Sequence, residues 1–501
     1  MRSRLSLSLC AAALLLSSRA FAVVYEADIK IEDEQDLYEL NARGVISDEA
    51  LEELVDLLRT GVDLNNANRD DLYELPGLTY EQVDRILAYR KLATHIDDPA
   101  DLVRNQILTP EQLLQIAPFL VIREAGGVVP VTGRVRAVTS YTAGDPYAPP
   151  SFLQLRLRAP LGFTAGLLAT TTRQRLGEVR WDDARQSLSA TAPTYGFELP
   201  KFFVQWRGAQ STVIGGTYRV GFGERLTLDN TSRQTPDGIY LDDSVLRLQR
   251  IQSSFCRITG GTGDDPDCTT SEDNLYITPD FRWRTGFRGL AGHVENLSAG
   301  SVDVDLTGFA SYQSRAVYQY AIYNTENCAD PHTDNVSACA APPVQLRNPN
   351  GDIATTRFTF QALPDFFNEA ATGGNASLSF GPGKHLGLTG YYARPIFGAN
   401  TPIDFQEYAP YPYGGGFGAV GIDGALSLEH LNLFAEASRS FDNEPQGKGG
   451  GYAVIQRSVY SFLKQELELS LRYYDRDYLN PYSRAISEPD RLDGQRVRNE
   501  A

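Results

Sequence analysis

The chain has 501 residues, of which 22% are charged and 42% are hydrophobic, and its formal net charge is −17. This length leaves room for two or three domains. The acidic balance argues against broad electrostatic binding to nucleic acid, because phosphates attract lysine and arginine. Beyond the first residues no stretch approaches 18 consecutive apolar residues, so the sequence predicts no transmembrane helix.

Residues 1–22 have the pattern of a secretory signal peptide. Arg2 and Arg4 precede the apolar run 5–16, and Ala20-Phe21-Ala22 forms a cleavage site, so the mature chain is expected to begin at Val23. A membrane anchor is the alternative, but the apolar run is too short to span a bilayer. Export then places the remaining chain in an oxidising compartment.

Residues 23–60 form an acidic segment that is expected to be helical, and residues 61–125 continue a helical repeat. Segment 23–125 holds 23 acidic and nine basic residues, a net charge of −14. Stretches 36–49, 71–81 and 101–111 each contain Asp-Leu, then Ser or Thr, then Glu. Ser and Thr are favoured helix N-caps, and Pro110 suits a first helical position. Apolar residues at helical spacing, such as Val83 and Ile86, predict helix-turn-helix units that share one core.

The middle repeat resembles the helix-hairpin-helix motif, in the form found in ComEA-type competence proteins. The shared residues are Leu64-Asn65-Asn66-Ala67, Leu75-Pro76-Gly77-Leu78 and Ile86-Leu87-Ala88-Tyr89-Arg90, and the resemblance covers residues 62–122. It implies that backbone N–H groups of the hairpin approach a phosphate, helped by nearby cations. The DNA-binding candidates are Gly77, Thr79, Arg85, Arg90 and Lys91.

The sequence nevertheless favours protein docking over DNA binding for this domain. Thr79 stands where the family has a second glycine, and the second hairpin, residues 105–109, has no glycine. A domain with a net charge of −14 repels the DNA backbone. We therefore expect a periplasmic protein partner, with DNA as the alternative.

From about Val128 to Ala501 the pattern changes to short stretches of period two. Residues 152–159, 201–207, 281–288, 301–313 and 466–473 alternate apolar with polar side chains, which indicates strands with one dry and one wet face. A secreted β-sandwich also alternates. The signal peptide, the 26 Tyr and 23 Phe, and the mixture of tight and long turns favour an antiparallel transmembrane β-barrel in outer-membrane lipid, with roughly 12 to 16 strands.

Two stretches of this region, 216–226 and 473–482, resemble bacterial outer-membrane barrels that have helix-hairpin-helix repeats at their front. The first reads Gly-Thr-Tyr-Arg-Val-Gly-Phe-Gly-Glu-Arg-Leu, with Glu224-Arg225 in place of the family's polar-Gly pair. The resemblance implies an α + β chain in the outer membrane of a Gram-negative bacterium. Its small all-α helix-hairpin-helix domain lies in the periplasm, and residues 128–501 form the barrel. Because residues 493–501 lack the usual terminal aromatic, the chain is expected to be truncated there.

Four cysteines follow the signal peptide: Cys256, Cys268, Cys328 and Cys339. Three connectivities are open, and the local pairs Cys256–Cys268 and Cys328–Cys339 are favoured because they close short loops. No CxxC spacing is present, so a zinc site is not expected here.

The sequence contains no recognisable catalytic, metal-binding or cofactor motif. Its five histidines are not spaced as metal ligands, and Gly-x-Ser-x-Gly, a phosphate loop and HExxH do not occur. Arginines two residues apart point to one side of a strand, and three such pairs are candidates for the lumen: Arg134 and Arg136, Arg156 and Arg158, Arg282 and Arg284. A basic wall would favour anionic solutes. The preferred interpretation is that acidic residues in the same lumen neutralise it, namely Asp303, Asp305, Glu466 and Glu468.

These observations predict a non-enzymatic envelope protein whose acidic repeats dock a periplasmic protein or partly gate the barrel. DNA handling at the cell envelope is the first alternative, and a solute channel is the second.

Overall fold

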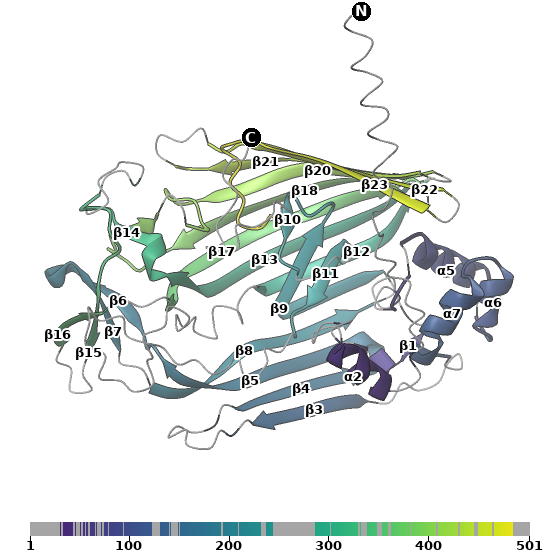
Figure 1. Cartoon of the computed structure of the whole chain (residues 1–501), viewed down its shortest axis with the longest axis horizontal. Coiled ribbons are helices and arrows are strands. Elements are labelled where there is room, and N and C mark those ends of the chain that lie inside the picture. The colour runs from purple at the N-terminus through teal and green to yellow at the C-terminus, as the bar shows by residue number, and fades with distance from the viewer. Residues whose placement is uncertain are drawn as a thin grey trace, which may run out of the picture. The chain divides into compact units, whose positions relative to one another are not determined.

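The computed structural model divides into two compact units, residues 1–126 and 127–501. It describes residues 31–122, 131–141, 149–243 and 286–483, each range with short gaps. The first unit is helical and the second is built on a large antiparallel sheet (Figure 1), as the sequence predicted. Among these residues no helix is long and apolar enough to cross a membrane.

The first unit packs short helices around a single core. Its elements are α2 (Glu34–Ala42), β1 (Val62–Asp63), α5 (Tyr80–Ala93), α6 (Ala100–Arg104), α7 (Pro110–Ile116), the 3-10 helix η1 (Ala117–Phe119) and β2 (Leu120–Val121). Strands β1 and β2 pair in parallel, so the first residues of the helix-hairpin-helix region lie beside its last residues. All three sequence repeats contribute to the core, including Leu37, Leu72, Val83, Ile86 and Leu102.

Local signals in the sequence explain how these helices begin. Thr109 is the N-cap of α7, Pro110 is its first residue, and Thr109 and Gln112 form a reciprocal capping box. Such a box satisfies two backbone N–H groups that have no partner within the helix. Val83 and Ile86 are fully buried on α5, so the predicted helical face is confirmed.

The second unit contains a sheet of fifteen strands, of which β10 and β11 lie off the main path. The path is β23-β22-β21-β20-β18-β17-β13-β12-β9-β8-β5-β4-β3, and its edge strands β3 and β23 are not paired with each other. The bounds are β3 (Thr132–Thr139), β4 (Ser151–Ala159), β5 (Phe163–Arg175), β8 (Thr194–Arg207), β9 (Ser211–Phe222), β10 (Leu228–Asp229), β11 (Gly238–Leu241), β12 (Phe287–Ala299), β13 (Val302–Tyr318), β17 (Ala362–Ser379), β18 (Lys384–Ile396), β20 (Phe417–Ser427), β21 (Leu431–Asp442), β22 (Tyr452–Phe462) and β23 (Gln465–Tyr474).

The connections of this sheet differ sharply between its two ends. At one end six hairpins have connections of two to four residues, at 160–162, 208–210, 300–301, 380–383, 428–430 and 463–464. At the other end every connection is longer, at 140–150, 176–193, 223–286, 319–361, 397–416 and 443–451. We call these the short-turn end and the long-connection end.

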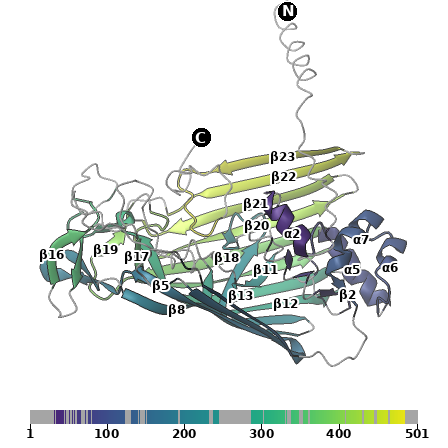
Figure 2. The same cartoon turned by 60° about the horizontal axis from the view of Figure 1, so that its bottom comes forward.

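Part of the long connections is folded at the long-connection end (Figure 2). A four-stranded sheet joins β6 (Val179–Asp182), β7 (Ser187–Thr191), β15 (Val344–Arg347) and β16 (Ile353–Phe358), and β14 (Ile322–Asn324) pairs with β19 (Ile403–Phe405). Their apolar side chains share a core that includes Leu188, Ile322, Val344 and Phe405. Cys328 and Cys339 form a disulfide in this region, which confirms the predicted local pair, whereas Cys256 and Cys268 lie outside the described residues.

Candidate functional site in the interior of the sheet

The two faces of the large sheet differ in the chemistry of their side chains. Leu306, Ala376, Leu388 and Ile422 lie in register across four neighbouring strands and therefore share one face. On that face Leu388 is 56% exposed and Ile422 is 51% exposed. Exposed apolar residues continue on other strands from β3 to β23, including Val135, Val204, Leu290, Val454 and Leu469. We call this surface the apolar outer face.

Alternate residues on many of the same strands are buried on the opposite, inner face, and a large share of them are polar. In β8, Lys201 and Gln205 are buried, whereas Phe202, Val204 and Trp206 are exposed. This alternation was predicted from the sequence. Its polarity is the reverse of that in water-soluble proteins, whose charged residues are rarely buried and whose large apolar patches are rarely exposed.

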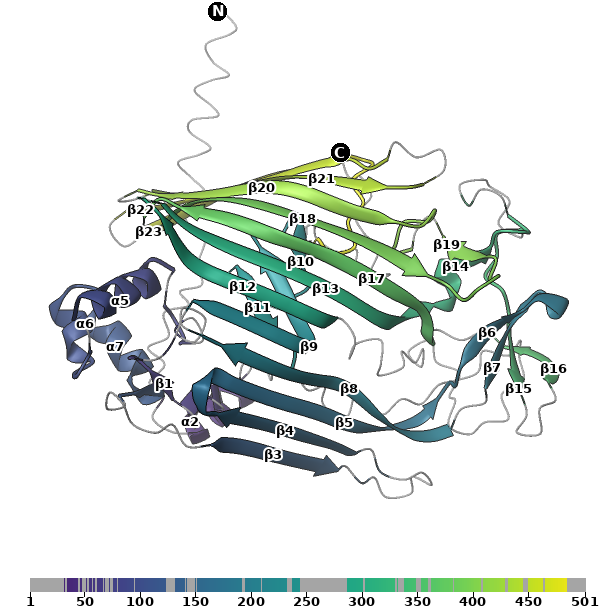
Figure 3. The ribbon, with the colours of Figure 1, turned by 180° about the vertical axis from the view of Figure 1, so that it is seen from behind.

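One segment of the chain lies on the inner side of the sheet (Figures 1 and 3). Up to Gly216, β9 pairs with β8, and beyond it the same edge of β9 pairs with β11 instead. Gly216 has φ +114°, and a Cβ there would lie 2.2 Å from the carbonyl oxygen of Phe202. Only glycine fits this close approach. The stretch 216–226 that resembles known barrels is thus the place where the chain leaves the wall.

The first polar cluster joins this inner segment to the wall. Lys201 Nζ lies 2.7 Å from Asp242 Oδ1, and Arg219 Nε donates to the same oxygen at 3.0 Å. Burial opposes the charge on Asp242, but the attraction of Lys201 and Arg219 lowers the pKa of this carboxyl below its ordinary value. The cluster therefore combines two cationic side chains with one carboxylate.

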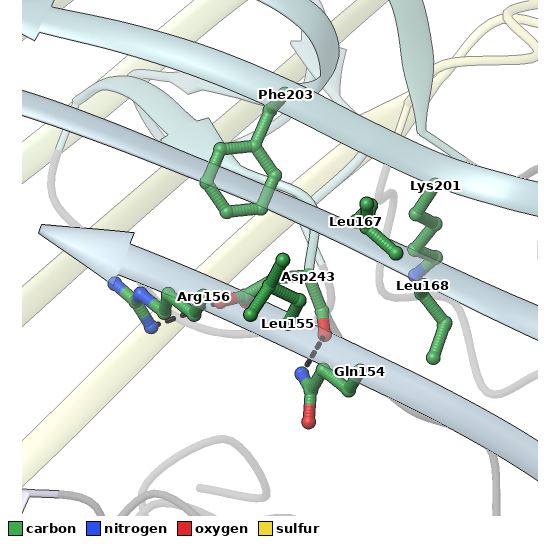
Figure 4. A pocket seen from close by; sticks show the side chains of 8 residues that line it. All are labelled: Gln154, Leu155, Arg156, Leu167, Leu168, Lys201, Phe203 and Asp243. Carbon is green, nitrogen blue, oxygen red and sulfur yellow. Dashed lines mark hydrogen bonds and ion pairs between the residues drawn. The ribbon is translucent and has the colours of Figure 1, made fainter. Parts of the chain in front are cut away.

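Asp243 extends this contact to β4, beside a small pocket (Figure 4). Arg156 Nη1 donates to Asp243 Oδ2 at 2.9 Å, and Gln154 Nε2 donates to the backbone oxygen of Asp243 at 3.1 Å. Asp243, which is not among the acidic residues named from the sequence, thus neutralises a predicted lumenal arginine. Asp305 has a different partner, since it accepts the backbone N–H of Asn296 near the short-turn end.

A second cluster lies on β13 and β17. Arg315 Nη2 donates to Glu369 Oε1 and to the Tyr482 hydroxyl, each at 2.8 Å, and Tyr482 in turn donates to Glu369. Glu369 is fully buried. Tyr482 belongs to residues 475–483, which follow β23 and form a second inner segment.

The two inner segments bind each other and the wall. The Tyr478 hydroxyl donates to the Leu226 carbonyl at 2.7 Å, and Asn480 Nδ2 donates to the carbonyls of Leu226 and Thr227. Glu436, on β21, accepts the backbone N–H groups of Leu226 and Thr227 at 3.0 and 2.7 Å. These contacts fix residues 226–227 between β21 and residues 478–480.

The remaining predicted lumenal arginines are placed as follows. Arg134 lies directly opposite Arg156 in the β3–β4 pair, and Arg136 lies over the Phe152 ring, with 5.4 Å from its guanidinium carbon to the ring centroid. Arg158 is half-buried on the same side of β4. Arg282 and Arg284 lie outside the described residues. The sequence interpretation did not single out Lys201, Asp242, Arg315, Glu369, Glu436 and Tyr482, although it noted that 216–226 and 473–482 resemble stretches of known barrels.

The DNA-binding candidates of the first unit are only partly gathered. Gly77 is exposed with φ +79°, and Arg85 and Lys91 are exposed on α5. Arg90 is half-buried, and its Nη1 donates to the carbonyls of Leu64 and Ala67 in the lead-in segment. Its guanidinium therefore holds the hairpin together. Thr79 lies outside the described residues.

Comparison with known proteins identifies a family for part of the first unit. A family model described as "Helix-hairpin-helix motif" matches residues 58–121, so the first unit contains a helix-hairpin-helix domain. No curated protein matches the chain.

Among solved structures, the chain is similar to OmpT, an outer membrane protein of Vibrio cholerae. The identity is 9%, the match covers 68% of this chain and 86% of that chain, and the TM-score is 0.25. It is also similar to a mutant of Rh. blastica porin, with 12% identity, coverage of 68% and 94%, and a TM-score of 0.18. These TM-scores are below 0.5, so the similarity does not by itself establish a shared fold.

Proposed function

We propose that the chain is a non-enzymatic outer-membrane β-barrel protein that holds a helix-hairpin-helix docking domain in the periplasm. The observation that supports this most strongly is the apolar outer face opposite a buried, charged inner face. Hydrocarbon accepts such a face, and strands that alternate in this way line outer-membrane barrels. Closure between β3 and β23 is part of the proposal, because an unpaired sheet edge is not tolerated in hydrocarbon.

The connections of the sheet support a particular orientation. Outer-membrane barrels have short periplasmic turns and longer extracellular loops. The chain enters the sheet at Thr132, which pairs with Arg158. Because Arg158 lies beside the tight turn 160–162, this entry point is at the short-turn end. The helix-hairpin-helix domain precedes this point in the chain, so the same rule assigns it to the periplasm.

The inner segments favour docking over solute transport. Residues 219–231, 237–243 and 475–483 lie on the inner face and are held by the Asp242, Glu369 and Glu436 clusters. An ion pathway along the basic wall would have to bypass Asp243, which already pairs with Arg156. We therefore propose a closed interior in the resting protein.

Protein docking is also favoured over DNA binding. The exposed cations Arg85 and Lys91 stand in a domain of net charge −14, and Arg90 is occupied with backbone carbonyls. The acidic surface of this domain would attract a partner protein with basic residues.

Orientation is tested by labelling single cysteines in intact cells. Ala399 is exposed at the long-connection end, and Lys384 is exposed at the short-turn end. A membrane-impermeant maleimide should label Ala399→Cys in intact cells and Lys384→Cys only after the outer membrane is permeabilised. Equal labelling of both in intact cells would contradict the proposal.

The closed interior, and the preference for docking over DNA binding, are tested with the purified protein. In planar bilayers we expect no steady conductance, and a stable open channel would favour solute transport. In gel-shift titrations with duplex DNA at low and high salt we expect no retardation, whereas salt-sensitive retardation would favour DNA binding.

A further inference from the structure

A potential metal-binding cluster lies where the first inner segment meets the wall. Asp237 precedes β11, His385 lies in β18 and Asp423 lies in β20. One ligand atom from each residue lies within 4.8 Å of the other two. His385 Nε2 is 3.0 Å from Asp423 Oδ2, although the two residues are 38 positions apart in the chain. This distance in sequence explains why spacing alone predicted no metal site.

Two glycines leave room for the Asp423 carboxylate. Gly387 lies directly opposite Asp423 in the β18–β20 pair, and a Cβ on Gly387 would lie 2.3 Å from Asp423 Oδ1. On the other side, a Cβ on Gly223 would lie 2.9 Å from the Asp423 Cβ. The absence of side chains at both positions allows a carboxylate to stand between strand and inner segment.

The burial of the three residues suits a site that an ion can enter. The Asp423 side chain is 3% exposed, whereas those of His385 and Asp237 are 31% and 34% exposed. A buried ligand is thus fixed in place, and two accessible ligands face solvent. The short-turn end lies nearby, because His385 is the second residue of β18 after the tight turn 380–383.

The surrounding charges leave an excess of carboxylates. Glu224 and Glu436 lie close enough to Asp423 for mutual repulsion. Among the residues that the structure describes, two guanidinium groups stand near: Arg225, 3.6 Å from Asp237, and Arg457, 3.4 Å from Glu224. A bound cation would relieve the repulsion among these carboxylates.

We propose that Asp237, His385 and Asp423 bind one divalent transition-metal ion, with Zn²⁺ as the best match. Imidazole together with carboxylate oxygens suits such ions better than Ca²⁺ or Mg²⁺, which prefer oxygen ligands alone. Water completes the coordination through the accessible side. The ion would share ligands from the inner segment, β18 and β20, and would therefore cross-link the inner segment to the wall. It is independent of whether the protein docks a partner.

The experiment uses the full chain, purified without a histidine tag, stripped of metal and folded in detergent. Binding of ZnCl₂ is measured by isothermal titration calorimetry, and CoCl₂ is added separately because its visible absorption reports tetrahedral nitrogen and oxygen ligands. We expect one ion per chain and a loss of affinity of at least about tenfold in His385→Gln and in Asp423→Asn.

His293→Gln is the matched control. His293 also lies on the sheet wall, but its ring contacts the Thr307 hydroxyl at 2.8 Å, outside the cluster. This variant should bind Zn²⁺ like the parent protein. Heat-modifiable mobility in gel electrophoresis shows whether each variant is folded, and Asp237→Asn serves in place of any variant that is not. No binding by the parent chain, or equal binding by folded His385→Gln and Asp423→Asn, would overturn the proposal.

Discussion

The apolar outer face leads to a prediction whose sign depends on the surrounding solvent. Ile422 is the middle residue of β20, is 51% exposed and lies opposite Leu388. In hydrocarbon, Ile422→Arg should reduce the free energy of unfolding by about 2–4 kcal/mol, the usual effect of arginine near the bilayer midplane. In water, an arginine at such an exposed position should change the free energy of unfolding by only about 0.5 kcal/mol or less.

Leu426, four residues further along the same face of β20, provides the depth control. Four residues extend about 14 Å along a strand, and a tilt of about 45° reduces this to about 10 Å of depth. Because the apolar band of a barrel is about 25 Å tall, Leu426 lies close to its edge, and Leu426→Arg should cost only about 0–1 kcal/mol. The assay is reversible guanidinium unfolding in phospholipid vesicles, followed by the fluorescence of the three tryptophans. Two arginine variants of equal stability, both within 0.5 kcal/mol of the parent as water predicts, would refute the membrane assignment.

Three further predictions concern contacts that can be removed singly. Lys201→Met leaves Asp242 buried without the ammonium group of Lys201 and should cost about 3 kcal/mol in the same assay; adding Asp242→Asn should restore part of this, and no recovery would mean that the pair is not coupled. Arg90→Ala removes two bonds to backbone carbonyls and should lower hydrogen-exchange protection of α5 by about 2 kcal/mol, whereas Lys91→Ala at an exposed position of the same helix should not; equal effects would contradict a structural role for Arg90. Cys328→Ser opens a short ring worth about 3 kcal/mol, so proteases added to intact cells should cleave this region faster; unchanged cleavage would count against an exposed, disulfide-stabilised position.

The parts of the fold that follow from short stretches of sequence could be predicted. Thr109 and Pro110 set the start of α7 by themselves, and the alternation of Lys201 with Phe202 assigns opposite faces without knowledge of the neighbouring strands. The interior clusters could not be predicted in this way. Arg315 reaches Glu369 across 54 positions, and Tyr482 reaches Glu369 across 113, so both contacts depend on strand register and on the inner segments.

The same limit applies to the lumenal arginines. The alternation of side chains along β4 placed Arg156 on the inner side. It could not show that Asp243 would be its partner, because residues 242–243 belong to a segment that leaves the wall at Gly216. A glycine within a strand signals a close backbone approach in general. Which strand approaches it depends on tertiary structure.

The bond between Asn480 and Leu226 has a consequence for assembly, because 254 positions separate these residues. Contacts so distant in sequence form late and slowly. The carbonyl groups of residues 226–227 gain these partners only after the fourteen described strands from β10 to β23, and the segment that follows them, have been synthesised. Strands β3 to β23 can therefore pair before these inner contacts form, and the locking of the interior depends on residues 475–483.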